Sequence, residues 1–165
     1  VVAAPSLPSL PRIGVVMTLP PDLEQLAWFG PGPHETYIDR KAGARVGRYV
    51  STVTDQYVPY IMPQEHGNYV DCRWLQLTDE SGAGLRFVAQ PLMECSASHF
   101  AAADLYAALH TNELTPRPEV IVTLDAQQRG LGTGSCGPQT LDKYEVKPGT
   151  WEFNYRLVPV GVTQK

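Results

Sequence analysis

The sequence VIVTLDAQQRGLGTGSCGPQT, residues 120–140, contains the features that decide the fold. It begins with an apolar run rich in β-branched side chains, which is typical of a buried strand. Four glycines and a proline then occur within residues 130–138, and this composition excludes both a helix and a central strand. The stretch therefore predicts a shaped loop that a β-sheet anchors, and such loops commonly carry function.

Alternation of apolar and polar residues is clearest at residues 12–19 and 150–159, and both segments are predicted as half-buried strands. The residues expected to face the core are Ile13, Val15, Met17, Leu19, Trp151, Phe153, Tyr155 and Leu157. Further strands are predicted at residues 23–29, 45–52, 72–78, 85–90, 93–100 and 119–125. The segment SGAG, residues 81–84, is the best hairpin turn among them.

One helix is predicted over residues 101–110, and Asn112 can end it. Its apolar stripe consists of Ala101, Leu105, Ala108 and Leu109. About eight strands with one short connecting helix indicate an all-β fold, an antiparallel β-sandwich. A chain of 165 residues is one domain by the usual length and can bury a substantial core.

The charge of the chain limits its partners. The formal net charge is −4, and the longest basic run is the pair Arg40-Lys41, so neither nucleic acid nor an anionic membrane is an expected partner. No apolar stretch approaches the roughly 20 residues of a membrane span, and the N-terminus lacks the basic and apolar parts of a secretory signal. A soluble protein is therefore expected.

The cysteines indicate a reducing environment. Cys72, Cys95 and Cys136 are odd in number and widely spaced, which suggests neither a disulfide framework nor a C-x-x-C metal site. Reduced thiols and a cytoplasmic location are expected.

Two more segments stand out beside the glycine-rich loop: WFGPGPHETYIDR, residues 28–40, and DQYVPYIMPQEHGN, residues 55–68. In this order, the three segments resemble the C-terminal domain of the large bacterial β-galactosidases of glycoside hydrolase family 2. The resemblance implies part of a supersandwich of the galactose mutarotase type. Residues 1–10 would be a linker or truncated lead-in, 11–160 the C-terminal β-sandwich domain, and 161–165 a tail.

The family enzyme is several times longer, so the chain is expected to be a fragment. It begins at Val1 without an initiator Met, and its first eleven residues contain three prolines. The resemblance implies a parent that hydrolyses terminal β-galactosides such as lactose with retention of configuration. It also implies a glutamate pair in a central (β/α)₈ barrel, Mg²⁺ and Na⁺ bound in other domains, and a homo-oligomer.

A glycosidase needs two carboxylates, one acting as an acid and the other as a nucleophile or base. The acidic residues with unusual neighbours are Glu35, Asp39, Glu65 and Asp71. Acidic residues beside Gly and Pro usually form turns and caps, and the resemblance places the catalytic pair elsewhere. No catalytic residue and no metal ligand is therefore assigned to this chain.

Two His-Glu neighbours suggest an alternative enzyme. The pairs His34-Glu35 and Glu65-His66 could serve acid-base chemistry, because the sandwich also resembles that of galactose mutarotases, which open a sugar ring in this way. A structural role in joining loops is favoured over a stand-alone epimerase.

Nearby ion pairs and aromatic residues receive structural assignments. Local ion pairs are expected for Asp39-Arg40 and Asp71-Arg73. The residues expected in the core are Trp28, Trp74 and Trp151, and those expected to be available for a surface contact with a sugar are Tyr37, Tyr57 and Tyr60.

Cys136 is the distinctive residue of the glycine-rich loop. In the family, the matching loop reaches the mouth of the active site, and some members carry a tryptophan there that stacks on the non-galactose part of the substrate. The resemblance therefore assigns substrate binding to Cys136, in a rim loop with Gly134, Ser135 and Gly137. No Lys or Arg follows Arg129 in this loop and no His adjoins the cysteine, so an ordinary thiol is expected rather than a nucleophile.

The expected partners are the remaining domains of the parent enzyme and a β-galactoside substrate. An independent galactoside-binding module is the second interpretation of the chain.

Overall fold

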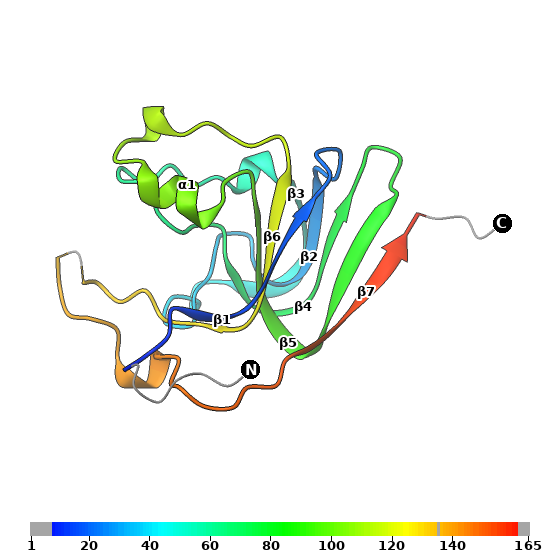
Figure 1. The fold of residues 1–165 in the computed structure, drawn as a ribbon. Coiled ribbons are helices and arrows are strands. Elements are labelled where there is room, and N and C mark those ends of the chain that lie inside the picture. Colours follow the sequence, from blue (N-terminus) through cyan, green and yellow to red (C-terminus); the bar gives the residue numbers. More distant parts are fainter. Residues whose placement is uncertain (1–7, 135, 162–165) are drawn as a thin grey trace.

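The computed structural model describes residues 8–134 and 136–161, so parts of the predicted lead-in and tail lie outside it. Within these residues, seven strands form one antiparallel sheet in the order β1-β6-β5-β4-β2-β3, and β7 pairs with β5 off this path (Figure 1). The strands are β1 Arg12–Leu19, β2 Gln25–Gly32, β3 Arg45–Thr52, β4 Tyr69–Thr78, β5 Gly84–Ser98, β6 Val120–Gln128 and β7 Asn154–Val160. The helical elements are α1 Ala102–Ala107 and the 3-10 turns η1 Thr54–Gln56, η2 Thr111–Glu113 and η3 Asp142–Tyr144. The all-β antiparallel fold class with one short helix is confirmed.

Strand β5 joins two segments that the sequence separates at Pro91. Residues 84–90 pair with β7, and residues 94–98 pair with β6. Pro91 lies between these two pairings, where the sheet needs no backbone N–H, so a proline is tolerated inside the strand. The predicted hairpin is confirmed, because Asp79 and Ala83 bond across the turn and Gly82 takes a φ of +83°.

The helix is shorter than the sequence predicts. Leu105 and Ala108 are buried as expected, but the helix ends at Ala107 and Leu109 is 60% exposed. The N–H of Leu109 bonds to the carboxylate of Glu113 at 2.9 Å, which offers the backbone a partner outside a helix.

The edge strands bury less than their alternation predicts. Val15 of β1 and Leu157 of β7 are 37% and 49% exposed, whereas Ile13 and Leu19 are buried. Each of these two strands pairs with one neighbour only, so fewer side chains cover it.

One hydrophobic core contains side chains of β1, β2, β4, β5 and β6. β2 and β6 are not neighbours in the sheet, so the sheet curves around this core. Trp28 lies inside it, 2% exposed, between the rings of Tyr49 and Tyr69 at centroid distances of 5.1 and 4.2 Å. The core prediction is confirmed for Trp28 but is wrong for Trp74 and Trp151, which are only half-buried and lie outside the cluster.

Candidate functional site

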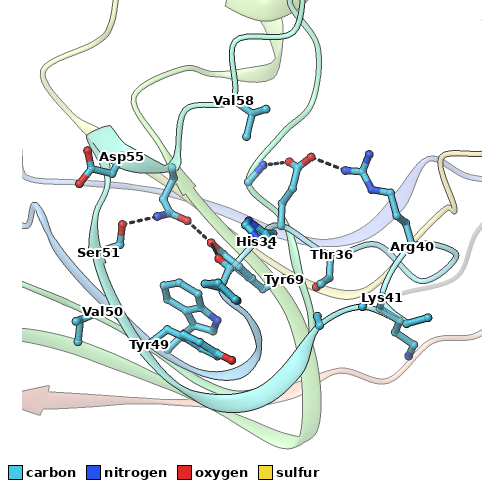
Figure 2. A pocket seen from close by; sticks show the side chains of 18 of the residues that line it. His34, Thr36, Arg40, Lys41, Tyr49, Val50, Ser51, Asp55, Val58 and Tyr69 are labelled. Atoms are coloured by element: carbon cyan, nitrogen blue, oxygen red, sulfur yellow. Dashed lines mark hydrogen bonds and ion pairs between the residues drawn. The ribbon is translucent and has the colours of Figure 1, made fainter.

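The loop between β2 and β3 is organised around the carboxylate of Glu35. One of its oxygens accepts the N–H of Gly67 at 2.7 Å and the hydroxyl of Tyr37 at 3.4 Å. The other oxygen accepts from the guanidinium of Arg40 (Figure 2) and also from the hydroxyl of Tyr60. A single side chain therefore ties this loop to the segment before β4, the loop-joining role expected of the His34-Glu35 pair, whereas His34 is exposed at the cleft.

The three tyrosines proposed for a surface contact are engaged within the protein. Tyr37 is only 1% exposed, and burial raises the pKa of its hydroxyl, so this prediction is wrong for Tyr37. Burial and the neighbouring Glu35 also raise the pKa of Tyr60. Tyr57 packs against the rings of His66 and Phe100 at 5.2 and 5.3 Å.

Asp39 fixes the glycine-rich loop to the β2–β3 loop. Its carboxylate accepts the N–H groups of Leu131 at 3.1 Å and Gly132 at 2.8 Å. A Cβ at Gly130 would lie 2.9 Å from this carboxylate, and Gly132 has a φ of +62°, so both positions favour glycine. The predicted Asp39-Arg40 ion pair is wrong, because Arg40 pairs with Glu35 and Asp39 serves the loop backbone instead.

The far end of this loop presents the cysteine. The N–H of Cys136 bonds to the carbonyl of Thr133 at 3.0 Å, and the N–H of Thr133 bonds to the carbonyl of Pro138 at 3.1 Å. Cys136 is an exposed free thiol in this turn, and Gly134 and Gly137 are exposed beside it. Ser135, the fourth residue of the predicted rim loop, lies outside the described residues.

A cleft of about 880 Å³ lies next to the Asp39 anchor. The rings of Tyr49 and Tyr69 line it on one side, and His34, Lys41 and Asp55 lie around it (Figure 2). Its size is in the range of small-molecule sites, which run from about 300 to 1,000 Å³. Aromatic and polar groups in one cleft suit a neutral polyol, whose apolar face packs on a ring while its hydroxyls meet polar side chains.

Part of the cleft wall is already hydrogen-bonded. Gln56 donates to the hydroxyl of Ser51 at 2.8 Å and accepts from the hydroxyl of Tyr69 at 2.5 Å. These contacts fix the aromatic side of the cleft in one arrangement.

Asp71 holds Lys41, a residue of this wall, through an ion pair. It pairs with Lys41 at 2.6 Å, while Arg73 donates to the backbone carbonyl of Asp71 at 2.8 Å. The predicted Asp71-Arg73 ion pair is therefore wrong. Asp71 has a φ of +54°, a conformation that Asp tolerates better than most residues.

The second His-Glu pair does not form a site. Glu65 pairs with Arg12 at 3.0 Å, and buried His66 contacts the carbonyl of Gln64 through Nδ1 at 3.0 Å. Neither residue lines the cleft. Of the two pairs, only His34-Glu35 borders the cleft, and the carboxylate of Glu35 is engaged by Gly67, Tyr37, Arg40 and Tyr60.

Sequence reasoning missed a buried carboxylate pair on the neighbouring strands β5 and β6. Glu94 and Asp125 lie opposite each other in the sheet and are 6% and 0% exposed. Asp125 accepts two bonds from Arg12, at 2.6 and 3.0 Å, and Glu94 accepts one from Asn68 at 3.2 Å. Burial raises the pKa of Glu94 to about 7 and that of Asp125 to about 6. The sequence signal that could have found this pair is one acidic residue within each of two apolar strands.

Neither of these acids borders the cleft. Within residues 8–134 and 136–161, no three His, Cys, Asp or Glu side chains come together as a candidate metal site. In the same part of the chain, no helix has the length and apolar character needed to cross a membrane.

Comparison with known proteins identifies relatives over nearly the whole chain. A family model described as "Beta galactosidase small chain" matches residues 1–158. The β-galactosidase of Vibrio cholerae is 40% identical over 135 residues, which cover 82% of this chain and 12% of the relative. That of Priestia megaterium is 37% identical over 131 residues, 78% of this chain and 13% of the relative. That of Arthrobacter is 34% identical over 143 residues, which cover 84% of this chain and 14% of the relative. The chain therefore spans only a small part of the length of each relative.

Replacing Glu35 by Gln should lower the free energy of unfolding by about 2 to 3 kcal/mol, because several hydrogen bonds lose a charged acceptor and Arg40 loses its counter-charge. Urea unfolding followed by tryptophan fluorescence measures the change. The matched control is Glu152→Gln, whose carboxylate accepts one exposed hydrogen bond from Asn154 at 3.0 Å. Equal effects of the two substitutions would contradict the central role of Glu35.

The buried acids should make the fold less stable as pH rises. Their folded-state pKa values of about 7 for Glu94 and about 6 for Asp125 exceed those of the unfolded chain, so folding retains protons that unfolding releases. The stabilisation that comes from holding Glu94 and Asp125 protonated is present near pH 4 and is lost as the pH rises through 6 to 7. Urea midpoints measured from about pH 5 to pH 8 should fall, and Glu94→Gln should flatten this profile. If the urea midpoint of Glu94→Gln fell with pH as steeply as that of the unchanged protein, titration of Glu94 would be excluded as the cause.

Proposed function

The chain belongs to the β-galactosidase small-chain family, and we propose that it is the C-terminal part of a β-galactosidase of glycoside hydrolase family 2. The family match over residues 1–158 carries this proposal. The relatives are named β-galactosidases and are several times longer than the chain, which supports a parent with further domains. In that parent, residues 11–160 would form the C-terminal β-sandwich domain.

In this proposal, the chain contributes structure and one loop at the rim of the active site. Cys136 would line the acceptor side, with Gly134, Ser135 and Gly137 shaping the turn. The carboxylate of Asp39 supports this assignment, because it holds the base of the loop through two backbone N–H groups. A loop fixed at its base can hold a contact residue in one place against a substrate.

Catalysis would occur outside the chain. Retaining hydrolysis of a terminal β-galactoside such as lactose needs a nucleophile and an acid-base group about 5.5 Å apart. The four acidic residues considered from the sequence have structural partners in this fold instead: Glu35, Asp39, Glu65 and Asp71. The glutamate pair, Mg²⁺ and Na⁺ would belong to other domains of a cytoplasmic homo-oligomer.

A galactoside-binding module is the second candidate function, and the cleft of about 880 Å³ favours it. Tyr49 offers a ring there, while His34, Lys41 and Asp55 offer hydrogen-bonding groups. Galactose binding by the isolated chain that Tyr49→Ala abolishes would support this function. The epimerase alternative has no comparable support, because Glu35 is engaged in loop contacts.

The isolated chain should not hydrolyse a chromogenic β-galactoside, whereas the full-length parent should. The reason is that no carboxylate pair in this chain is assigned to catalysis. Assays of both proteins at equal concentration test the difference. Turnover by the isolated chain that survives repurification and is lost in Glu35→Gln or Glu65→Gln would contradict the proposal.

Replacing Cys136 by Trp in the full-length parent should tighten acceptor binding several-fold. An indole gives glucose a larger apolar surface than a thiol, and such stacking contributes on the order of 1 kcal/mol. Inhibition by glucose and the KM for lactose measure the acceptor side, while inhibition by galactose should stay nearly constant. Cys136→Ser is the control for loss of the thiol. Equal changes for both sugars, or none, would mean that this loop does not line the site.

A further inference from the structure

An arginine-rich face covers the outer side of the sheet, away from the core. Arg48 of β3 lies opposite Phe29, Phe29 opposite Trp74, Trp74 opposite Val88, and Val88 opposite Arg156 of β7. Residues directly opposite each other in an antiparallel sheet have side chains on the same side. These five residues therefore form one row across β3, β2, β4, β5 and β7.

Three guanidinium groups of this face lie over aromatic rings. Those of Arg48 and Arg73 are 5.8 and 5.4 Å from the ring centre of Phe29. That of Arg86 is 4.7 Å from the ring centre of Trp74. Phe29 and Trp74 are themselves 6.4 Å apart. We define the arginine face as these two aromatic residues and the four arginines Arg48, Arg73, Arg86 and Arg156.

None of the four arginines of this face has an ion-pair partner among the described residues. By contrast, Arg12, Arg40, Lys41 and Arg117 each have a carboxylate partner. Unpaired positive charge is thus gathered on one side of a chain whose formal net charge is −4.

Apolar side chains flank the arginines. Val46 and Val50 lie two residues before and after Arg48 on β3 and are 55% and 84% exposed, and Val158 lies opposite Arg86 and is 36% exposed. Arginine and tryptophan amid apolar contacts are the composition of energetically important protein interfaces. The face therefore has the chemistry of a protein-docking surface with a preference for carboxylates.

We propose that the arginine face docks an acidic surface contributed by the rest of the parent polypeptide. The inference rests on the proposed function, and the chain spans only 12 to 14% of the relatives described above, so most of the parent lies elsewhere. A second copy placed face to face would set arginine against arginine. Nucleic acid is disfavoured because the rest of this chain is negatively charged.

Zero-length cross-linking of the full-length parent tests the proposal. Arg48→Lys and Arg156→Lys each place an amine on the face, and a carbodiimide joins such an amine only to a carboxylate in contact with it. The matched control is Arg45→Lys, because Arg45 is exposed and lies on β3 but alternates to the other side of the strand. Mixing isotopically labelled and unlabelled protein before cross-linking separates links within one polypeptide from links between copies.

The expected result is a link from the amine that Arg48→Lys or Arg156→Lys introduces to an Asp or Glu outside this chain in the same polypeptide. Its yield should exceed that of the control at least about tenfold and should fall at high salt. Links between copies, or yields equal to the control, would overturn the proposal. Activity of the same parent on a β-galactoside is measured separately, so an active enzyme without these links would overturn the docking surface alone.

Discussion

Two carboxylates in one short loop connect the separate segments of the candidate site. Glu35 binds Tyr60 and Gly67, and Asp39, four residues later, accepts the N–H groups of Leu131 and Gly132 in the glycine-rich loop. Both contacts join segments that are distant in sequence, and charge-assisted bonds to backbone N–H groups are among the stronger hydrogen bonds in proteins. Asp39 thus both borders the cleft and anchors the loop that carries Cys136.

The strands were predictable because the signals for them are local. Alternation and flanking turn residues gave the exact limits of residues 12–19 and 45–52, and the hairpin at Gly82 followed from its composition. The same local reasoning divided β5 at Pro91, because no local signal shows that β5 changes partner there. The exposure of Val15 was also not predicted, because it depends on β1 being an edge strand of the sheet, which the local pattern does not show.

The partners of charged groups were not predictable, because they are set by tertiary distance. Sequence neighbours suggested Asp39 with Arg40, yet Asp39 binds residues more than ninety positions away. The glycine-rich loop was recognised from composition, but its anchor was not. Glu94 and Asp125 were missed for a related reason. A single acidic residue in an apolar strand does not show by itself that a second one lies opposite it, because the pairing of the strands is not local information.

The pairing of β1 with β6 also constrains when the fold can form. Arg12 lies opposite Gln128, so the partner of the first strand is made more than one hundred residues after it. Contacts of such long sequence separation form slowly, and chains fold as they emerge during synthesis. On the ribosome, β1 would therefore stay unpaired while β2 to β5 are made, and the edge of the sheet would be completed only when β6 follows.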